Sequence, residues 1–155
     1  MRTLSQDEFS LKPLPASQDQ VRQSRVVIDG KVTQAVVDGV VLEAALQWRQ
    51  GYLVFATDDI PFEEMLRITL LDADLRVVDS ARIGGMYTTG VFSSMKLEGA
   101  DTVRFRFLGG TDWRVKILPA PGFRVPFLSE PRGVARPLGF SRRFVVTGNP
   151  QPESR

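Results

Sequence analysis

Arginine supplies the chemistry that this 155-residue sequence most clearly offers, with sixteen arginines against four lysines. A guanidinium is planar and carries five N–H donors, so arginine suits bidentate binding of carboxylates and phosphates better than lysine does. Residues 1–80 hold 8 basic and 13 acidic side chains, whereas residues 81–155 hold 12 basic and 5 acidic ones. This asymmetry predicts either a basic surface for an anionic partner or oppositely charged strands that pair across one sheet.

The first cluster of cations lies on a predicted β-hairpin, formed by Thr102–Leu108 and Trp113–Leu118 around a glycine-rich turn. Apolar and polar residues alternate along both strands, so one face should enter the core and the other should carry the charges. The anion-binding candidates on that outer face are Arg104, Arg106, Arg114 and Lys116. Same-face residues lie roughly 7 Å apart, near the spacing of backbone phosphates, but no aromatic residue interleaves to stack on bases. The alternative is a solvated face that pairs with acids such as Glu43 or Asp79.

The second cluster lies in residues 131–143, a segment that has no periodicity of its own. Its partner-binding candidates are Arg132, Val134, Arg136, Leu138, Phe140, Arg142 and Arg143. Arginine interspersed with apolar residues is typical of a protein interface, and long loops without secondary structure are uncommon unless they are functional. The alternative is a loop that wraps its own domain and tucks its apolar side chains under the sheets.

Catalytic chemistry is restricted because the sequence contains no histidine and no cysteine. Ser-His-Asp and Cys-His catalysis, disulfides and the usual zinc sites are therefore excluded. We expect no metal, no cofactor and no enzymatic activity. One carboxylate cluster, Asp58, Asp59, Glu63 and Glu64, is compatible with a hydrolase that uses paired acids. The same four residues suit the capping of a single short helical turn equally well.

Turn signals recur at short intervals along the chain, which is typical of an all-β domain. We expect a single antiparallel β-sandwich or flattened barrel of about eight to ten strands, with one or two short helical turns. The expected divisions are a flexible N-terminal arm over residues 1–24, a β-sandwich domain over 25–147 and a frayed C-terminal tail over 148–155. Residues 40–48 contain strong helix formers but have a period of two, so we favour a strand there.

These features favour a non-catalytic binding, adaptor or structural module that engages a protein partner through the arginine-rich loop and the basic hairpin face. A nucleic-acid or polyanion binder is the first alternative, and a carboxylate-dependent hydrolase is the second. The N-terminus has no signal-peptide pattern, and no apolar run approaches the roughly 18 residues of a membrane span. We therefore expect a soluble, cytoplasmic protein without membrane insertion, and a homo-oligomer is compatible with the sequence.

Overall fold

Three antiparallel sheets make up the protein, which is described by a computed structural model over residues 1–16, 20–60, 64–84, 90–123, 130–137 and 141–148. The six-stranded sheet has the order β1-β5-β6-β7-β8-β12, the four-stranded sheet β13-β11-β10-β9, and the three-stranded sheet β2-β3-β4. The strands are β1 (Arg2–Thr3), β2 (Phe9–Pro13), β3 (Gln23–Ile28), β4 (Lys31–Asp38), β5 (Val41–Trp48), β6 (Gly51–Thr57), β7 (Leu66–Leu71), β8 (Val77–Ile83), β9 (Ser93–Glu98), β10 (Thr102–Arg106), β11 (Asp112–Phe123), β12 (Val134–Ala135) and β13 (Ser141–Gly148).

The six-stranded and four-stranded sheets pack face to face around the larger of two hydrophobic cores. The β10–β11 hairpin shows how the sequence produces this layer, because its alternate residues Val103, Phe105, Trp113 and Val115 are completely buried. Val103 lies opposite Val115 and Phe105 lies opposite Trp113, as a hairpin centred on the glycine-rich turn requires. The predicted hairpin, with one apolar and one charged face, is confirmed.

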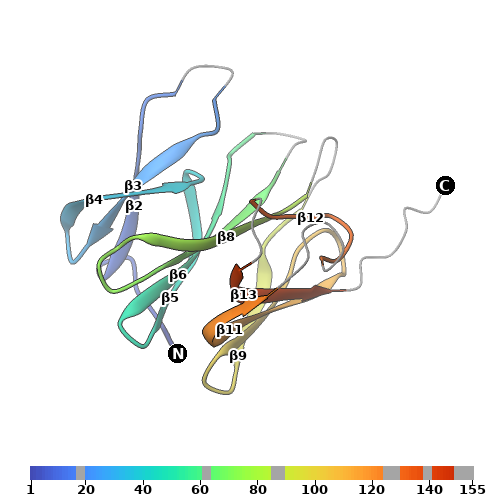
Figure 1. The fold of residues 1–155 in the computed structure, drawn as a ribbon. Helices are drawn as coiled ribbons and strands as arrows, with labels where there is room; N and C mark the ends of the chain where they lie inside the picture. The colour runs from blue at the N-terminus through green and yellow to red at the C-terminus, as the bar shows by residue number, and fades with distance from the viewer. Residues whose placement is uncertain (17–19, 61–63, 85–89, 124–129, 138–140, 149–155) are drawn as a thin grey trace.

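The three-stranded sheet covers the other face of the six-stranded sheet and encloses a second, smaller core. The six-stranded sheet can be covered on both sides because its strand β6 carries apolar side chains on both faces. Its residue Phe55 enters the larger core, whereas its neighbour Val54 packs in the smaller core. Phe9 of β2 and Val26 of β3 contribute the facing side of that smaller core. In Figure 1 the blue sheet and the yellow-to-red sheet accordingly lie on opposite sides of the cyan-to-green strands.

The expected all-β antiparallel architecture is confirmed, although several of its details differ. The described residues form thirteen strands rather than eight to ten, and none of the three sheets closes into a barrel. Residues 41–48 form a strand, as the period of two predicts. No helix occurs in the described ranges, and the expected helical turn near residue 60 falls partly on residues 61–63, outside them. Nothing in those ranges is a helix long and apolar enough to cross a membrane.

Residues 1–24 do not form the expected arm without regular structure, because they contain β1 and β2. β1 pairs with the end of β5, and the backbone N–H of Leu4 continues this contact by donating to the Ala45 carbonyl at 2.9 Å. Phe9 of β2 is completely buried in the smaller core. At the surface, Arg2 donates a hydrogen bond to the Glu8 carboxylate, and this bond lowers the pKa of Glu8. The sequence did not reveal these strands because their apolar alternation is too short to be told from a loop. Of the expected tail, Gly148 ends β13, and residues 149–155 lie outside the described ranges.

Gly39 joins the three-stranded sheet to the six-stranded sheet in a conformation that disfavours any other residue. Its φ is +102°, and a Cβ added there would lie 2.6 Å from the Cβ of Ala56. We expect Gly39→Ala to lower the free energy of unfolding by about 2–3 kcal/mol, since strain and overpacking combine. Gly30 is the matched control, because its φ is +80° but the space around it is open. Urea titration measures both variants, and Gly30→Ala should lower the free energy of unfolding by only about 1 kcal/mol. An equal loss for both variants would contradict the close approach at Gly39.

Candidate binding surfaces

The outer face of the four-stranded sheet gathers the first predicted cluster of cations. Arg104 of β10 lies opposite Arg114 of β11 on one side and opposite Lys96 of β9 on the other. Residues paired in this way project from the same face of a sheet. The resulting surface, which we call the basic face, consists of Lys96, Arg104, Arg106, Arg114 and Lys116. Sequence reasoning missed Lys96, because nothing local indicates that residues 93–98 pair with this particular hairpin.

Two carboxylates on the basic face pair with three of its arginines. Glu98 Oε1 is 3.6 Å from Arg104 Nη1, and Glu98 Oε2 is 3.1 Å from Arg114 Nε. Asp112 Oδ1 lies 3.1 Å from Arg106 Nε. All five side chains are roughly one-third to one-half exposed, so solvent screens these pairs and each stabilises the fold by less than about 1 kcal/mol. Their main effect is to orient the guanidiniums while leaving donors free for a partner.

Glu43 and Asp79, the acids expected to pair with this face, lie elsewhere, so that detail of the prediction is wrong. Glu43 Oε1 accepts a hydrogen bond from Thr57 Oγ1 at 3.0 Å, across the β5–β6 pair. Asp79 is buried, and its partner is Arg136. Both acids lie on the six-stranded sheet, whereas the basic face belongs to the four-stranded one.

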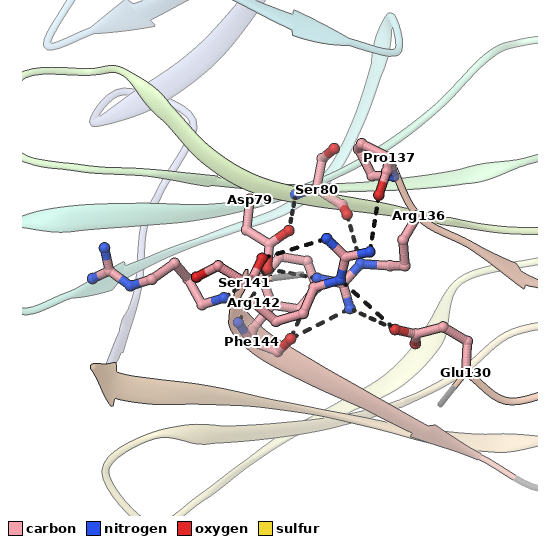
Figure 2. A network of polar contacts seen from close by, with 9 residues as sticks. Asp79, Ser80, Glu130, Arg136, Pro137, Ser141, Arg142 and Phe144 are labelled. Atoms are coloured by element: carbon pink, nitrogen blue, oxygen red, sulfur yellow. Dashed lines mark hydrogen bonds and ion pairs between the residues drawn. The ribbon is translucent and has the colours of Figure 1, made fainter. Parts of the chain in front are cut away.

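Arg136 and Asp79 form the centre of a buried polar network that links the two large sheets. Arg136 Nη2 lies 2.6 Å from Asp79 Oδ2, and the two side chains are 2% and 4% exposed. Arg136 Nε donates to the Ser80 carbonyl at 2.7 Å, and the guanidinium stacks 4.3 Å from the ring centroid of Phe144. Asp79 Oδ2 also accepts from the backbone N–H of Arg143 at 2.8 Å. Figure 2 shows these groups converging between the strand that carries Asp79 and the segments that carry Arg136 and Phe144.

Arg142 and Glu130 extend this network towards the loop that precedes β12. Arg142 Nη2 donates to the Pro137 carbonyl at 2.9 Å, and its side chain is almost fully buried. Glu130 Oε1 lies 3.5 Å from Arg136 Nη1 and 3.9 Å from Arg142 Nε. We call the four side chains of Asp79, Glu130, Arg136 and Arg142 the clasp, because they tie the loop and β13 to β8. Arg136 and Arg142 therefore face the interior of the protein, as in the alternative of a loop that wraps its own domain.

The other candidates in residues 131–143 have separate environments. Arg132 is exposed, whereas Val134 lies opposite Ile83 in the β12–β8 pair and packs against the larger core. Arg143 is half-buried and lines a small hollow beside Trp48. Leu138 and Phe140 lie outside the described residues. Among the described candidates, Arg136 and Arg142 therefore meet in the interior, whereas Arg132, Val134 and Arg143 have different environments.

The acidic cluster considered for hydrolysis is also divided. Asp58 is buried and receives two hydrogen bonds from Arg67, at 3.2 and 2.9 Å, so its charge is compensated. Asp59 is exposed and Glu64 is half-buried, while Glu63 lies outside the described residues. Within the described ranges, no three acidic side chains are arranged to hold a metal ion. A paired-acid mechanism needs two available carboxylates across a substrate, and Asp58 is already committed to Arg67.

The fold places this chain among all-β proteins of antiparallel sheets, with a sandwich of two large sheets and a third sheet added outside it. No protein-family model matches the chain, and neither a curated protein nor a solved structure matches it. Its function must therefore be argued from its own surfaces.

Proposed function

We propose that this protein is a non-catalytic binding module that engages an acidic surface of a protein partner through its basic face. The observation that carries the proposal is the concentration of five exposed or half-exposed cations on one sheet face, against the two carboxylates of Glu98 and Asp112. The strands beneath that face are held by the larger core, so the cations sit on a rigid support. Rigid positioning favours binding because less conformational entropy is lost when the partner docks.

The same face favours a protein over a nucleic acid as the partner. Glu98 and Asp112 would repel the regularly spaced phosphates of a nucleic-acid backbone. An acidic protein surface can instead place its carboxylates next to the arginines and away from Glu98 and Asp112. No aromatic residue projects outwards from the paired parts of β10 and β11, so bases have nothing there on which to stack. Arginine forks match carboxylates with bidentate geometry, and arginine is enriched at the centres of protein interfaces.

Charge reversal on the basic face tests this proposal. We expect the double variant Arg104→Glu/Arg114→Glu to lose protein partners captured by the wild-type chain from an extract, with at least a tenfold lower yield. Its thermal midpoint should change little, because both side chains are exposed enough for solvent to screen them. The matched control is Lys31→Glu/Arg76→Glu, which changes the net charge equally at two exposed positions away from this face.

Two outcomes would contradict the proposal. Equal loss of capture in both double variants would show a general effect of net charge. Binding of a duplex oligonucleotide that weakens log-linearly and steeply with salt, and that needs Arg104 and Arg114, would favour a polyanion binder instead.

A further inference from the structure

A small hollow lies between the ends of the β5–β6 and β7–β8 hairpins and β13. Its volume is about 180 Å³, and its walls include Trp48, Arg49, Leu70, Asp72, Val78 and Arg143. This volume is below the roughly 300–1,000 Å³ of pockets that take drug-sized ligands, so any occupant is small. Five of these six residues belong to the six-stranded sheet or its turns, whereas Arg143 lies on β13, which pairs with β11.

Arg143 reaches this hollow from a fixed backbone. The backbone N–H of Arg143 donates to Asp79 Oδ2 at 2.8 Å, so the clasp fixes the backbone from which this side chain extends. Its Nε is buried and has no hydrogen-bond partner among the described residues. Because this Nε has almost no surface that solvent can reach, a molecule in the hollow would be bound by the terminal Nη groups of Arg143 instead.

Arg49 contributes a second guanidinium to the same hollow. It sits in the β5–β6 turn, where its guanidinium stacks 4.5 Å from the ring centroid of Trp48. Within the part of the chain that the structure describes, neither Arg49 nor Arg143 has a carboxylate at ion-pair distance. Asp72 does line the hollow, but its Oδ1 accepts the backbone N–H groups of Asp74 and Arg76 within its own turn.

We propose that this hollow binds a small oxyanion, a carboxylate or a phosphate, between Arg49 and Arg143. Both arginines line one concavity, and neither has a carboxylate at ion-pair distance among the described residues. Each guanidinium can donate two parallel hydrogen bonds to such a group. The apolar walls formed by Trp48, Leu70 and Val78 lower the local dielectric, which strengthens these charge-assisted bonds. The hollow shares no residue with the basic face, although β13, which carries Arg143, pairs with β11 of that face.

Nuclear magnetic resonance of the full chain, titrated with inorganic phosphate and separately with benzoate at constant ionic strength, tests this site. We expect a saturable shift of the Trp48 indole N–H signal with at least one of the two probes, which also identifies the preferred oxyanion. Trp113 is an internal reference, because its indole N–H donates to the Phe107 carbonyl at 3.0 Å inside the larger core. Arg143→Met and Arg49→Met should each weaken binding by about tenfold or more, since each removes charge-assisted hydrogen bonds.

Arg22→Met is the matched control, because Arg22 is exposed and lines a different hollow. It should leave the affinity unchanged. If Arg143→Met fails to fold, the comparison rests on Arg49→Met, whose side chain lies in an exposed turn. The proposal is overturned if Trp48 responds to neither probe, or if Arg49→Met binds both probes as tightly as the wild-type protein. An equal loss of affinity in Arg22→Met would overturn it as well.

Discussion

Replacing Asp79 by alanine is expected to lower the free energy of unfolding by about 3–5 kcal/mol, one of the two largest effects that the structure predicts. The substitution leaves the Arg136 guanidinium buried without its closest counter-charge, which lies 2.6 Å away in the native protein. It also removes the acceptor of the backbone N–H groups of Ser80, Arg143 and Phe144. Because Asp79 connects β8 to β13, its loss weakens the attachment between the two large sheets.

Urea titration of the variants, followed by circular dichroism, measures this effect. A double-mutant cycle with Arg136→Met isolates the pair, and the double variant should lose clearly less stability than the sum of the two single losses. The exposed pair of Arg106 and Asp112 is the control, since both side chains are about half exposed. Asp112→Ala should cost less than about 1 kcal/mol. A loss below that value for Asp79→Ala would show that the clasp does not hold the sheets together.

Truncation of Phe105 is the second large effect, and we expect Phe105→Ala to cost about 3–5 kcal/mol. Phe105 is completely buried in the larger core. Its ring lies edge-on to Phe55 at a centroid distance of 5.2 Å and stacks on Phe92 at 5.3 Å. Removing the ring therefore leaves a cavity between the two large sheets and breaks two aromatic contacts at once.

The same urea titration tests this prediction, with Phe105→Leu and Val91→Ala as controls. Phe105→Leu refills most of the space and should cost roughly half as much as the alanine substitution. Val91 is 76% exposed, so Val91→Ala should change stability by no more than about 0.5 kcal/mol. If Phe105→Ala lowered the free energy of unfolding as little as Val91→Ala, the β10–β11 hairpin could not supply the central packing of the sandwich.

The clasp also decides which arginines a partner can contact. The sequence points to the arginine-rich loop, but Arg136 donates to Asp79 and to the Ser80 carbonyl, and Arg142 donates to the Pro137 carbonyl. Both guanidiniums are buried and form ion pairs with Glu130. Buried guanidiniums of this kind cannot meet a partner without breaking the clasp. On the basic face and at the hollow, by contrast, arginine side chains are exposed or half-buried and remain accessible to other molecules.

The sequence pattern was sufficient to predict a strand and its buried face wherever apolar and polar residues alternate along that strand. The β10–β11 hairpin could be predicted from the sequence, because Phe105 and Trp113 alternate with Arg104 and Arg114 around a turn that glycine permits. The strand at residues 41–48 could be read for the same reason, since its period outweighs the helix propensity of its residues. These inferences need only neighbours in sequence.

The candidate sites could be predicted only in part, because their decisive partners are distant in the chain. Arg136 and Asp79 are 57 residues apart, so no local pattern indicates that they meet. Lys96 joins the basic face only through the pairing of β9 with β10. The hollow needs Trp48 and Arg49 from one hairpin and Arg143 from another sheet.

The sequence by itself therefore determined the all-β class, the absence of histidine and cysteine chemistry, and the outward charges of one hairpin. The tertiary structure alone decided which arginines remain available, because that depends on which carboxylates and carbonyls the sheet packing brings within reach. It buried Arg136 and Arg142 in the clasp, and it left Arg49 and Arg143 facing a common hollow. Alternation fixes the face on which a side chain projects, whereas its partner is fixed by strands that are far away in sequence.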